Sequence, residues 1–439
     1  MPLIRPFRAL RYRQEAVGDL RLVVSPPYDV ISPEQQQTLL RRDPRNVVRL
    51  DLPAVEPGDA PDDRYRRAAR TLASWRSDGT LHKDPQPSVY AYEQTYRVPG
   101  TATERTQRGF FARLRLEPFG PESGVRPHER TLAPAREDRY RLLRATGVNT
   151  SPVVGLFEDR TGESPALLNG IATAPPDADV VDDDGVAHRM WRVPDDGTGD
   201  GTALALAAVA GRGPITIADG HHRYETALRY RDERRMSRSC EEDPAFDYLL
   251  ALLLDSTSEP LTVLPTHRVV RGAVAGASLL RDAVTLFRVD ANVTRDRLVQ
   301  EFTGLDGGGR GRFGLWWKAD GGGGAILDAR AEAFEKVERP GGSAARGLDV
   351  SLLAAALEQL FGIDADEVAA GGRVEYTKSS AEAMAMVDGG GPGDVAFLLE
   401  PTPVASILAV AREGDVMPQK STYFHPKPLT GLVINPHEW

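Results

Sequence analysis

Residues 215–227 constrain this chain more than any other stretch, because a β-branched apolar run passes through Asp219 and Gly220 directly into a segment of helical composition. Glycine allows the backbone to turn sharply and to approach a ligand closely. The first amides of the following helix favour an anion, and Arg223 offers a forked, charge-assisted contact to phosphate. The stretch therefore predicts a strand, a tight turn and a helix that together bind a nucleotide or another phosphate.

Within this unit we expect Gly220, His221 and Arg223 to bind phosphate, and Asp219 and His222 to act in catalysis. An alternative is that Asp219 caps the helix and that the histidines are ordinary first-turn residues. Capping does not explain two imidazoles and a guanidinium at the helix end where the dipole disfavours positive charge. A metal site built on both histidines is less favoured, because adjacent helical residues point about 100° apart and are poor joint ligands.

Two further segments carry groups suited to this chemistry. Around residues 126–131, His128 and Arg130 are candidates for binding a polyanion, and Glu129 is able to take a proton from a hydroxyl. The alternative for this segment is a solvated basic loop. Two prolines before Tyr28 and Asp29 stiffen the loop that presents them, and we expect both to contact the substrate.

The C-terminal segment from residue 417 to 427 is also dense in donors for phosphate. We expect Lys420, Ser421 and Thr422 to close over the bound phosphate. The alternative is a polar tail that packs across the body of the protein.

The overall composition narrows the class of protein. A net charge of −9 argues against a protein held on nucleic acid mainly by phosphate neutralisation. The single cysteine, Cys240, excludes an internal disulfide, is typical of a reducing cytoplasm, and lies in a charged run that suggests an incidental surface thiol. No apolar run approaches the roughly 20 residues that span a bilayer, and the first residues lack a signal-peptide pattern. We therefore expect a cytoplasmic protein without a membrane partner, and the sequence is compatible with a homo-oligomer.

Strand and helix patterns alternate irregularly, which predicts an α+β (mixed α/β) fold. Residues 172–202, rich in Pro, Asp and Gly, predict a surface excursion rather than a core element. The clearest strand patterns are a pair at 89–96 and 108–116, a buried strand at 246–255, and a hairpin of 312–318 with 325–328.

Four motifs, in this order along the chain, resemble the bacterial domain-of-unknown-function family 1015. They are Pro26-Pro27-Tyr28-Asp29, His128-Glu129-Arg130-Thr131, Asp219-Gly220-His221-His222-Arg223, and the run from Lys420 to Lys427. The resemblance extends over nearly the whole chain. Members of that family are uncharacterised and often encoded near serine-biosynthesis genes, so the resemblance by itself implies little chemistry.

The turn at Asp219 is also similar to the nucleotide-binding turn of the ParB/sulfiredoxin superfamily, in which a Gly-x-His-Arg or related turn holds nucleotide phosphates. That superfamily includes free-serine kinases. The resemblance implies a ParB/sulfiredoxin-like core embedded in a larger mixed-sheet body, with Asp219 at the reacting centre and Glu129 as the candidate for the kinases' upstream base. The phosphate-binding residues that it implies are Gly220, His221, His222 and Arg223.

We divide the chain into three regions on this basis. Residues 1–170 form an N-terminal α/β region with the first two motifs, residues 203–300 hold the ParB/sulfiredoxin-like motif, and residues 301–439 form a C-terminal α/β region that includes the donor-rich tail.

These inferences predict a phosphotransferase that moves phosphate from ATP or ADP to a small hydroxylated metabolite, with L-serine as one candidate. Mg²⁺ would bridge the phosphates and be held by carboxylates such as Asp219. The histidines and Arg223 would neutralise charge on the transferred group, and Glu129, or alternatively Asp29, would deprotonate the acceptor. Two alternatives remain: a nucleotide-binding regulatory protein without catalysis, and a hydrolase of nucleotides or phosphate esters.

Overall fold

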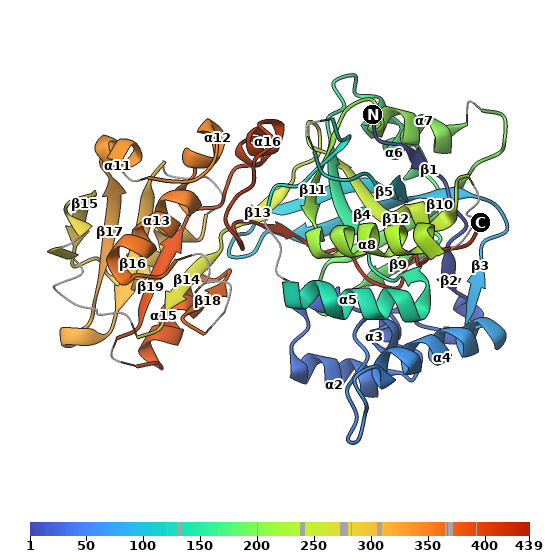
Figure 1. Ribbon diagram of the computed structural model, residues 1–439, viewed down its shortest axis with the longest axis horizontal. Coiled ribbons are helices and arrows are strands. Elements are labelled where there is room, and N and C mark those ends of the chain that lie inside the picture. The colour runs from blue at the N-terminus through green and yellow to red at the C-terminus, as the bar shows by residue number, and fades with distance from the viewer. Residues whose placement is uncertain are drawn as a thin grey trace.

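The computed structural model has two lobes, each built on its own β-sheet, and both chain termini lie in the larger lobe (Figure 1). The structure describes residues 1–439 except 121, 130–132, 200, 238–241, 273–279, 282, 305–309, 337, 365–366, 368–371 and 392. Arg130 and Cys240 therefore lie outside the described residues.

The larger lobe contains a nine-stranded sheet with both parallel and antiparallel neighbours. Because its two central strands are covered on both faces, their sequences are continuously apolar. In sheet order the strands are β6 (Val125–Arg126), β11 (Ile215–Asp219), β8 (Val153–Phe157), β12 (Tyr248–Asp255), β5 (Glu104–Arg115), β4 (Ser88–Arg97), β10 (Ala187–Pro194) and β9 (Ala178–Val181), with β1 (Ile4–Arg5) paired to β5.

The smaller lobe contains a six-stranded sheet. Its strands, in order, are β15 (Phe287–Ala291), β17 (Gly323–Ala329), β16 (Arg312–Trp317), β19 (Val395–Leu399), β14 (His267–Val270) and β18 (Val374–Thr377). Three two-stranded pairs complete the strands: β13 (Thr262–Leu264) with β20 (Tyr423–His425), β2 (Leu10–Tyr12) with β3 (Leu81–Lys83), and β21 (Asn435–Pro436) with β7 (Val148–Asn149).

Helices cover both sheets, and α5 packs against α8 in front of the large sheet (Figure 1). Among the described residues, no helix combines the length and the apolar character needed to cross a membrane. In the larger lobe the helices are α1 (Gln14–Val17), α2 (Pro33–Arg42), α3 (Val48–Asp51), α4 (Asp63–Ser77), α5 (Ala133–Thr146), α6 (Glu163–Ile171), α7 (Thr202–Ala210) and α8 (His221–Ser237). The later helices are α10 (Arg295–Phe302), α11 (Ala331–Lys336), α12 (Ser343–Arg346), α13 (Asp349–Phe361), α15 (Ser380–Asp388) and α16 (Val404–Arg412).

The predicted α+β class is confirmed, as are the β4–β5 and β16–β17 pairs and the buried strand β12. The prediction for residues 172–202 is wrong, because β9 and β10 from this range pair with each other and β10 pairs with β4. The division into three regions remains a prediction, and the large sheet takes strands from both 1–170 and 203–300.

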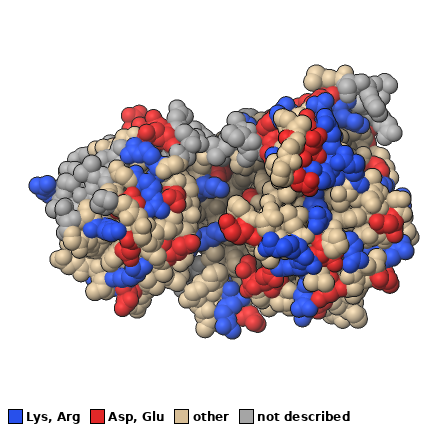
Figure 2. All heavy atoms as spheres, turned by 90° about the horizontal axis from the view of Figure 1, so that it is seen from below, with Lys and Arg blue, Asp and Glu red and all other residues tan. Residues whose placement is uncertain are grey.

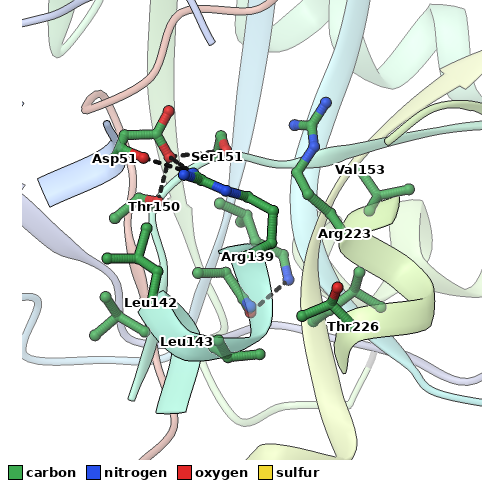
Figure 3. A pocket seen from close by; sticks show the side chains of 13 residues that line it. Asp51, Arg139, Leu142, Leu143, Thr150, Ser151, Val153, Arg223 and Thr226 are labelled. Atoms are coloured by element: carbon green, nitrogen blue, oxygen red, sulfur yellow. Dashed lines mark hydrogen bonds and ion pairs between the residues drawn. The ribbon is translucent and has the colours of Figure 1, made fainter. Parts of the chain in front are cut away.

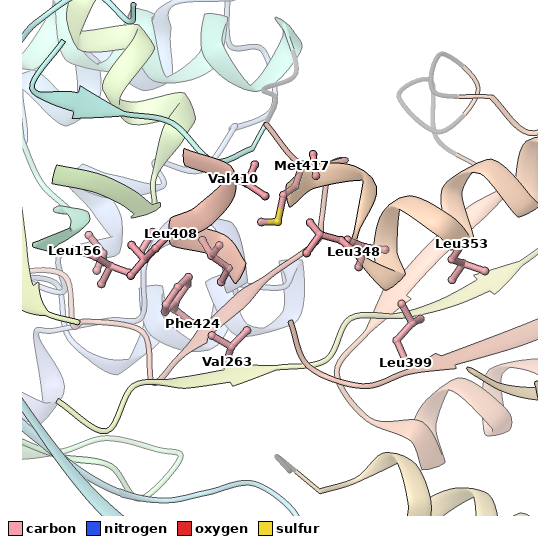
Figure 4. Packing of buried hydrophobic residues seen from close by; sticks show 14 of the residues in the cluster. Leu156, Val263, Leu348, Leu353, Leu399, Leu408, Val410, Met417 and Phe424 are labelled. Atoms are coloured by element: carbon pink, nitrogen blue, oxygen red, sulfur yellow. The ribbon is translucent and has the colours of Figure 1, made fainter. Parts of the chain in front are cut away.

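The lobes share an apolar cluster (Figure 4). Leu156 of β8, Phe424 of β20 and Leu408 of α16 belong to the same cluster as Leu348 and Leu399 of the smaller lobe. Burying a side chain of this size contributes about 1.5–3 kcal/mol. The contact between the lobes is therefore part of the folded core, and it fixes how the side chains of the two lobes face each other.

After the smaller lobe, the chain returns to the larger one. The backbone of Leu10 exchanges hydrogen bonds with Ile434, and β20 lies beside β11. The buried guanidinium of Arg113 on β5 donates to Asn435 Oδ1 at 2.7 Å and to the carbonyl of Pro436 at 2.5 Å. The C-terminal residues thus complete the larger lobe, and they hold the donor-rich segment before them against β11.

Candidate functional site

The strand, turn and helix predicted at residues 215–227 are present as β11, Gly220 and α8. A register shift between Ile217 and Asp219 in the β11–β8 pairing redirects the end of the strand. Gly220 then has φ +88°, and its carbonyl accepts a hydrogen bond from the N–H of Tyr224 at 3.0 Å. L side chains rarely adopt this backbone conformation, which explains the glycine.

Asp219 lies between two cations at the start of α8. Its Oδ2 accepts a hydrogen bond from Arg223 Nη2 at 2.5 Å, and its Oδ1 accepts one from Lys427 Nζ. The side chains of all three residues are mostly buried. Burial by itself raises the pKa of Asp219, but the charges of Lys427 and Arg223 outweigh it and hold that pKa well below its usual range. The carboxylate is therefore ionised and anchors both cations at the start of the helix.

Segments far apart in the sequence meet around this ion cluster. A carboxylate oxygen of Asp29 lies 3.9 Å from Arg223 Nη2, and the ring centroid of Tyr28 lies 6.0 Å from the Cζ of the same guanidinium. On another side, the backbone N–H of Lys420 donates to Glu129 Oε1 at 2.9 Å. Seen from below, the surface is hollowed between the two lobes, and basic and acidic side chains meet there (Figure 2).

His128 and His221 lie in the interior and have partners within the protein. His221 Nε2 accepts the backbone N–H of His128 at 3.3 Å, and their ring centroids are 4.6 Å apart. His128 Nδ1 contacts the carbonyl of Ile217, and its Nε2 lies 3.0 Å from Thr422 Oγ1. Burial lowers the pKa of His128 to about 4 and that of His221 well below its usual range. Both imidazoles are therefore neutral near pH 7, so they bring no positive charge, and their expected contacts with phosphate stay predictions.

Glu129 is a carboxylate with properties suited to accepting a proton. It is half-buried and forms an isolated backbone bridge with Met417 of the returning chain. Burial raises the pKa of Glu129 to about 7, even though the backbone N–H of Lys420 stabilises the charged form. A general base works best when its pKa is close to the operating pH. The structure thus gives the upstream glutamate a physical reason for the role that the sequence suggested.

The three C-terminal residues expected to close over phosphate differ from one another. Lys420 is exposed, whereas Ser421 is buried and donates its hydroxyl to a backbone carbonyl at 2.5 Å. The hydroxyl of Thr422 contacts an imidazole, as described above. Both hydroxyls therefore have partners within the protein, and the phosphate contacts expected for Lys420, Ser421 and Thr422 stay predictions. Lys427, which contacts Asp219, was not among the predicted site residues.

His222 is half-buried in the first turn of α8. Burial lowers its pKa, and the positive charge of Lys420 adds to this effect. It is neutral near pH 7, and its part in catalysis stays a prediction. The predicted phosphate contact of Arg130 also stays a prediction, because that residue lies outside the described part of the chain.

A small cavity of about 40 Å³ lies beside Arg223, with residues of α5, α8 and β12 in its lining (Figure 3). A water molecule needs roughly 10–15 Å³ measured in this way, so the cavity has room for about three waters and is too small for a purine ring. The Nε of Arg223 has no acceptor among the described residues, and such buried donors are usually satisfied by water or by a ligand.

A buried carboxylate in the lining of this cavity fixes the loop that carries Tyr28. Asp51 accepts hydrogen bonds from Thr150 Oγ1 at 2.6 Å, from Ser151 Oγ at 3.2 Å and from the backbone N–H of Tyr28 at 3.1 Å. Arg139 donates to the carbonyl of Asp51 at 2.5 Å, and its Cζ lies 3.9 Å from the ring centroid of Tyr28. The predicted site residues include neither Asp51 nor Arg139. Arg139 lies in the polar stretch that follows the motif at 126–131, and Asp51 lies in no motif.

Replacing Gly220 by alanine tests whether the close packing of this turn against the Arg223 side chain is needed for phosphate binding. A Cβ at Gly220 would lie 3.0 Å from Arg223 Nε, and a side chain at φ +88° costs about 1–2 kcal/mol. We expect Gly220→Ala to lower the free energy of unfolding by about that amount and to weaken pyrophosphate binding, measured by urea denaturation and calorimetry. Gly162→Ala is the matched control, because Gly162 has φ +74° with no heavy atom within 4 Å of the added Cβ. If both variants weaken pyrophosphate binding equally, the close packing of Gly220 against Arg223 is not what binding depends on.

The described residues offer no preformed cluster of side chains for a divalent metal. They contain no group of three His, Cys, Asp or Glu side chains arranged to hold an ion. Asp219, the expected Mg²⁺ ligand, already has one oxygen on Arg223 and the other on Lys427. Binding a metal there would require displacing one of these cations, and the expected Asp219–Mg²⁺ contact stays a prediction.

No curated protein matches the chain. Among solved structures, a conserved hypothetical protein from Pyrococcus furiosus is similar at 14% identity over 70% of this chain and 88% of that one, with a TM-score of 0.32. A free serine kinase in complex with AMP is similar at 13% identity over 75% of this chain and 92% of the kinase, with a TM-score of 0.34. At these values neither similarity assigns a function. Residues 4–351 match the family described as protein of unknown function DUF1015, and because this match spans most of the chain, the chain belongs to that family.

Proposed function

We propose that this protein transfers a phosphoryl group from ATP or ADP to the hydroxyl of a small metabolite, with L-serine as the first acceptor to test. The observation that carries the proposal is the meeting of four distant segments at the start of α8. Two cations anchored by Asp219 lie there beside a glycine turn, and the half-buried carboxylate Glu129 lies close by. A helix N-terminus with adjacent cations suits phosphate, and a carboxylate with a pKa near 7 suits a hydroxyl proton.

The residues divide into two roles. The N-terminal amides of α8, together with Arg223 and Lys427, bind the phosphates and neutralise the charge that develops on the leaving nucleotide. Glu129 accepts the proton of the acceptor hydroxyl as its oxygen attacks the terminal phosphorus. The bond between that phosphorus and the bridging oxygen breaks, and the bridging oxygen stays with the shortened nucleotide. In this scheme His128 and His221 keep β11 and the return segment in place, and no step requires a protein-held metal.

The choice of L-serine comes from the similarity of the Asp219 turn to that of free-serine kinases. The purified protein should be incubated with ATP or ADP, with and without Mg²⁺, and with a panel of hydroxylated metabolites that begins with L-serine. Phosphorus NMR and mass spectrometry then report whether a phosphate ester forms and whether nucleotide is consumed in equal amount. Formation of the ester supports the proposal. Tight nucleotide binding with no ester from any acceptor contradicts it and favours a regulatory protein, and steady phosphate release without an acceptor favours a hydrolase.

A further inference from the structure

A lysine of the smaller lobe reaches the site that the larger lobe forms. Lys378 follows β18, the edge strand of the six-stranded sheet, and precedes Ser379, whose side chain caps α15. Its Nζ lies 3.8 Å from the ring centroid of Tyr423 on β20, the strand that lies beside β11. The smaller lobe therefore places a cation next to the returning segment.

A second ammonium group lies over the ring of Tyr423. Lys427 Nζ lies 4.5 Å from the centroid of Tyr423, and it is also the group that contacts Asp219. Two cations on one ring repel each other unless negative charge lies nearby. Lys427 has such a partner, whereas no carboxylate forms an ion pair with Lys378 among the residues that the structure describes.

The charges that face Lys378 come from several elements. Burial lowers the pKa of Lys378, and the positive charges of Lys427 and Lys420 lower it further. The acidic groups near it are Asp29 on the Tyr28 loop, Glu382 on α15 and Asp184 in the turn between β9 and β10. Asp29 and Glu382 oppose the effect of the two lysines, but neither forms an ion pair with Lys378 among the described residues. An added anion within contact distance of the Lys378 ammonium would stabilise its charge.

We propose that Lys378 binds an anionic group of the ligand, so that one ligand contacts the start of α8 in the larger lobe and a lysine of the smaller lobe. The inference rests on the proposed function in one respect: it requires that an anionic ligand bind at the start of α8, close to Asp219. The anionic group is a phosphate of the nucleotide or a carboxylate of the acceptor, since an ammonium recognises both by the same charge-assisted contact. Lys378 thereby selects for charged ligands, and it explains why the site lies where the lobes meet.

Calorimetry with three probes tests the proposal on the full-length protein: inorganic pyrophosphate, ADP and L-serine. We expect Lys378→Gln to raise the dissociation constant of at least one probe by about tenfold, which is the typical effect of losing one charge-assisted hydrogen bond. Lys378→Arg should stay within about threefold of the parent protein, because the charge is retained. Arg70→Gln on the exposed face of α4 removes one positive charge elsewhere and controls for net charge. Circular dichroism verifies that each variant is folded.

The probes identify which anionic group is bound. Weaker binding of pyrophosphate and ADP alone assigns Lys378 to phosphate, and weaker binding of L-serine alone assigns it to a carboxylate. Unchanged binding of all three probes in Lys378→Gln overturns the proposal, as does equal weakening in Arg70→Gln. A failure of the proposed function gives a different result, because Lys378-dependent pyrophosphate binding without any phosphate ester leaves this inference standing.

Discussion

Glu129→Gln is expected to lower the rate of phosphate transfer by about 10³-fold, within the range that a positioned general base contributes. The glutamine keeps an oxygen that is able to accept the N–H of Lys420, now at 2.9 Å from Glu129 Oε1, so the backbone contact is preserved. Only the capacity to take a proton is lost. The nucleotide dissociation constant should therefore change by less than about threefold, as expected for a group that acts on the acceptor.

The pH dependence separates a base from a structural carboxylate. Burial raises the pKa of Glu129 to about 7, and only its deprotonated form accepts the hydroxyl proton. The rate should rise about tenfold per pH unit well below pH 7 and level off above it, because the deprotonated fraction rises in that way. In Glu129→Gln the rise of kcat/KM with pH below pH 7 should disappear.

Glu259 provides a matched control for this experiment. Burial also raises its pKa to about 7, and it accepts the backbone N–H of Arg108 at 2.6 Å, but it belongs to a different part of the larger lobe. Glu259→Gln should keep both the rate and the pH profile. If kcat/KM still rises with pH below pH 7 in Glu129→Gln, or if this rise is lost in Glu259→Gln, Glu129 is not the base.

The sequence predicted local elements well, because their signals depend on neighbouring residues. The apolar run of β12 and the aromatic, β-favouring residues of β4 lead to strands, and the turn at Gly220 leads to a helix. The strand β9 was missed although its burial alternates residue by residue, since the surrounding Asp and Gly residues gave a loop signal. Its pairing partner β10 also joins β4, about ninety residues earlier, and a local pattern does not contain that information.

For the site, the sequence identified the segments but not the state of each side chain. The pattern of His221 beside Arg223 suggested a cluster of positive charge, whereas burial makes the imidazole neutral. Lys427 lies at the end of the predicted C-terminal motif, but its contact with Asp219 joins residues far apart in the sequence and was not predicted. Lys378 lies in no motif, and its contact with Tyr423 also depends on the fold. Glu129 was predicted from its polar segment, and the resemblance to free-serine kinases added the role of a base. Its raised pKa follows from burial that only the fold produces.

Asp219→Asn is expected to lower the rate of phosphate transfer by about 100-fold, an effect typical of misplacing the groups that hold a substrate. The carboxylate fixes Arg223 through Oδ2 at 2.5 Å and contacts Lys427 through Oδ1. An asparagine offers one oxygen and one NH₂ group, so one of the two cations would face a donor. That cation would then shift from the position that the transfer step requires, although it would still be able to bind an anion.

The same change separates binding from transfer. Removing one negative charge beside Arg223 and Lys427 should tighten pyrophosphate binding, even as transfer slows. Stability should also fall, by about 3 kcal/mol, because breaking a mostly buried ion cluster leaves cations without a partner. Calorimetry, a transfer assay and urea denaturation measure the three quantities on one preparation.

Glu137→Gln is the matched control, because Glu137 also lies between two cations, Arg141 at 2.9 Å and Arg229 at 2.7 Å, but on an exposed surface. It should change stability by less than about 1 kcal/mol and leave transfer unchanged. A transfer rate in Asp219→Asn within about threefold of the parent protein is too small a change for a residue that positions both phosphate-binding cations. That result would remove the α8 site from the reaction, whereas tighter pyrophosphate binding with slow transfer would confirm that Asp219 orients the cations without itself binding the phosphate.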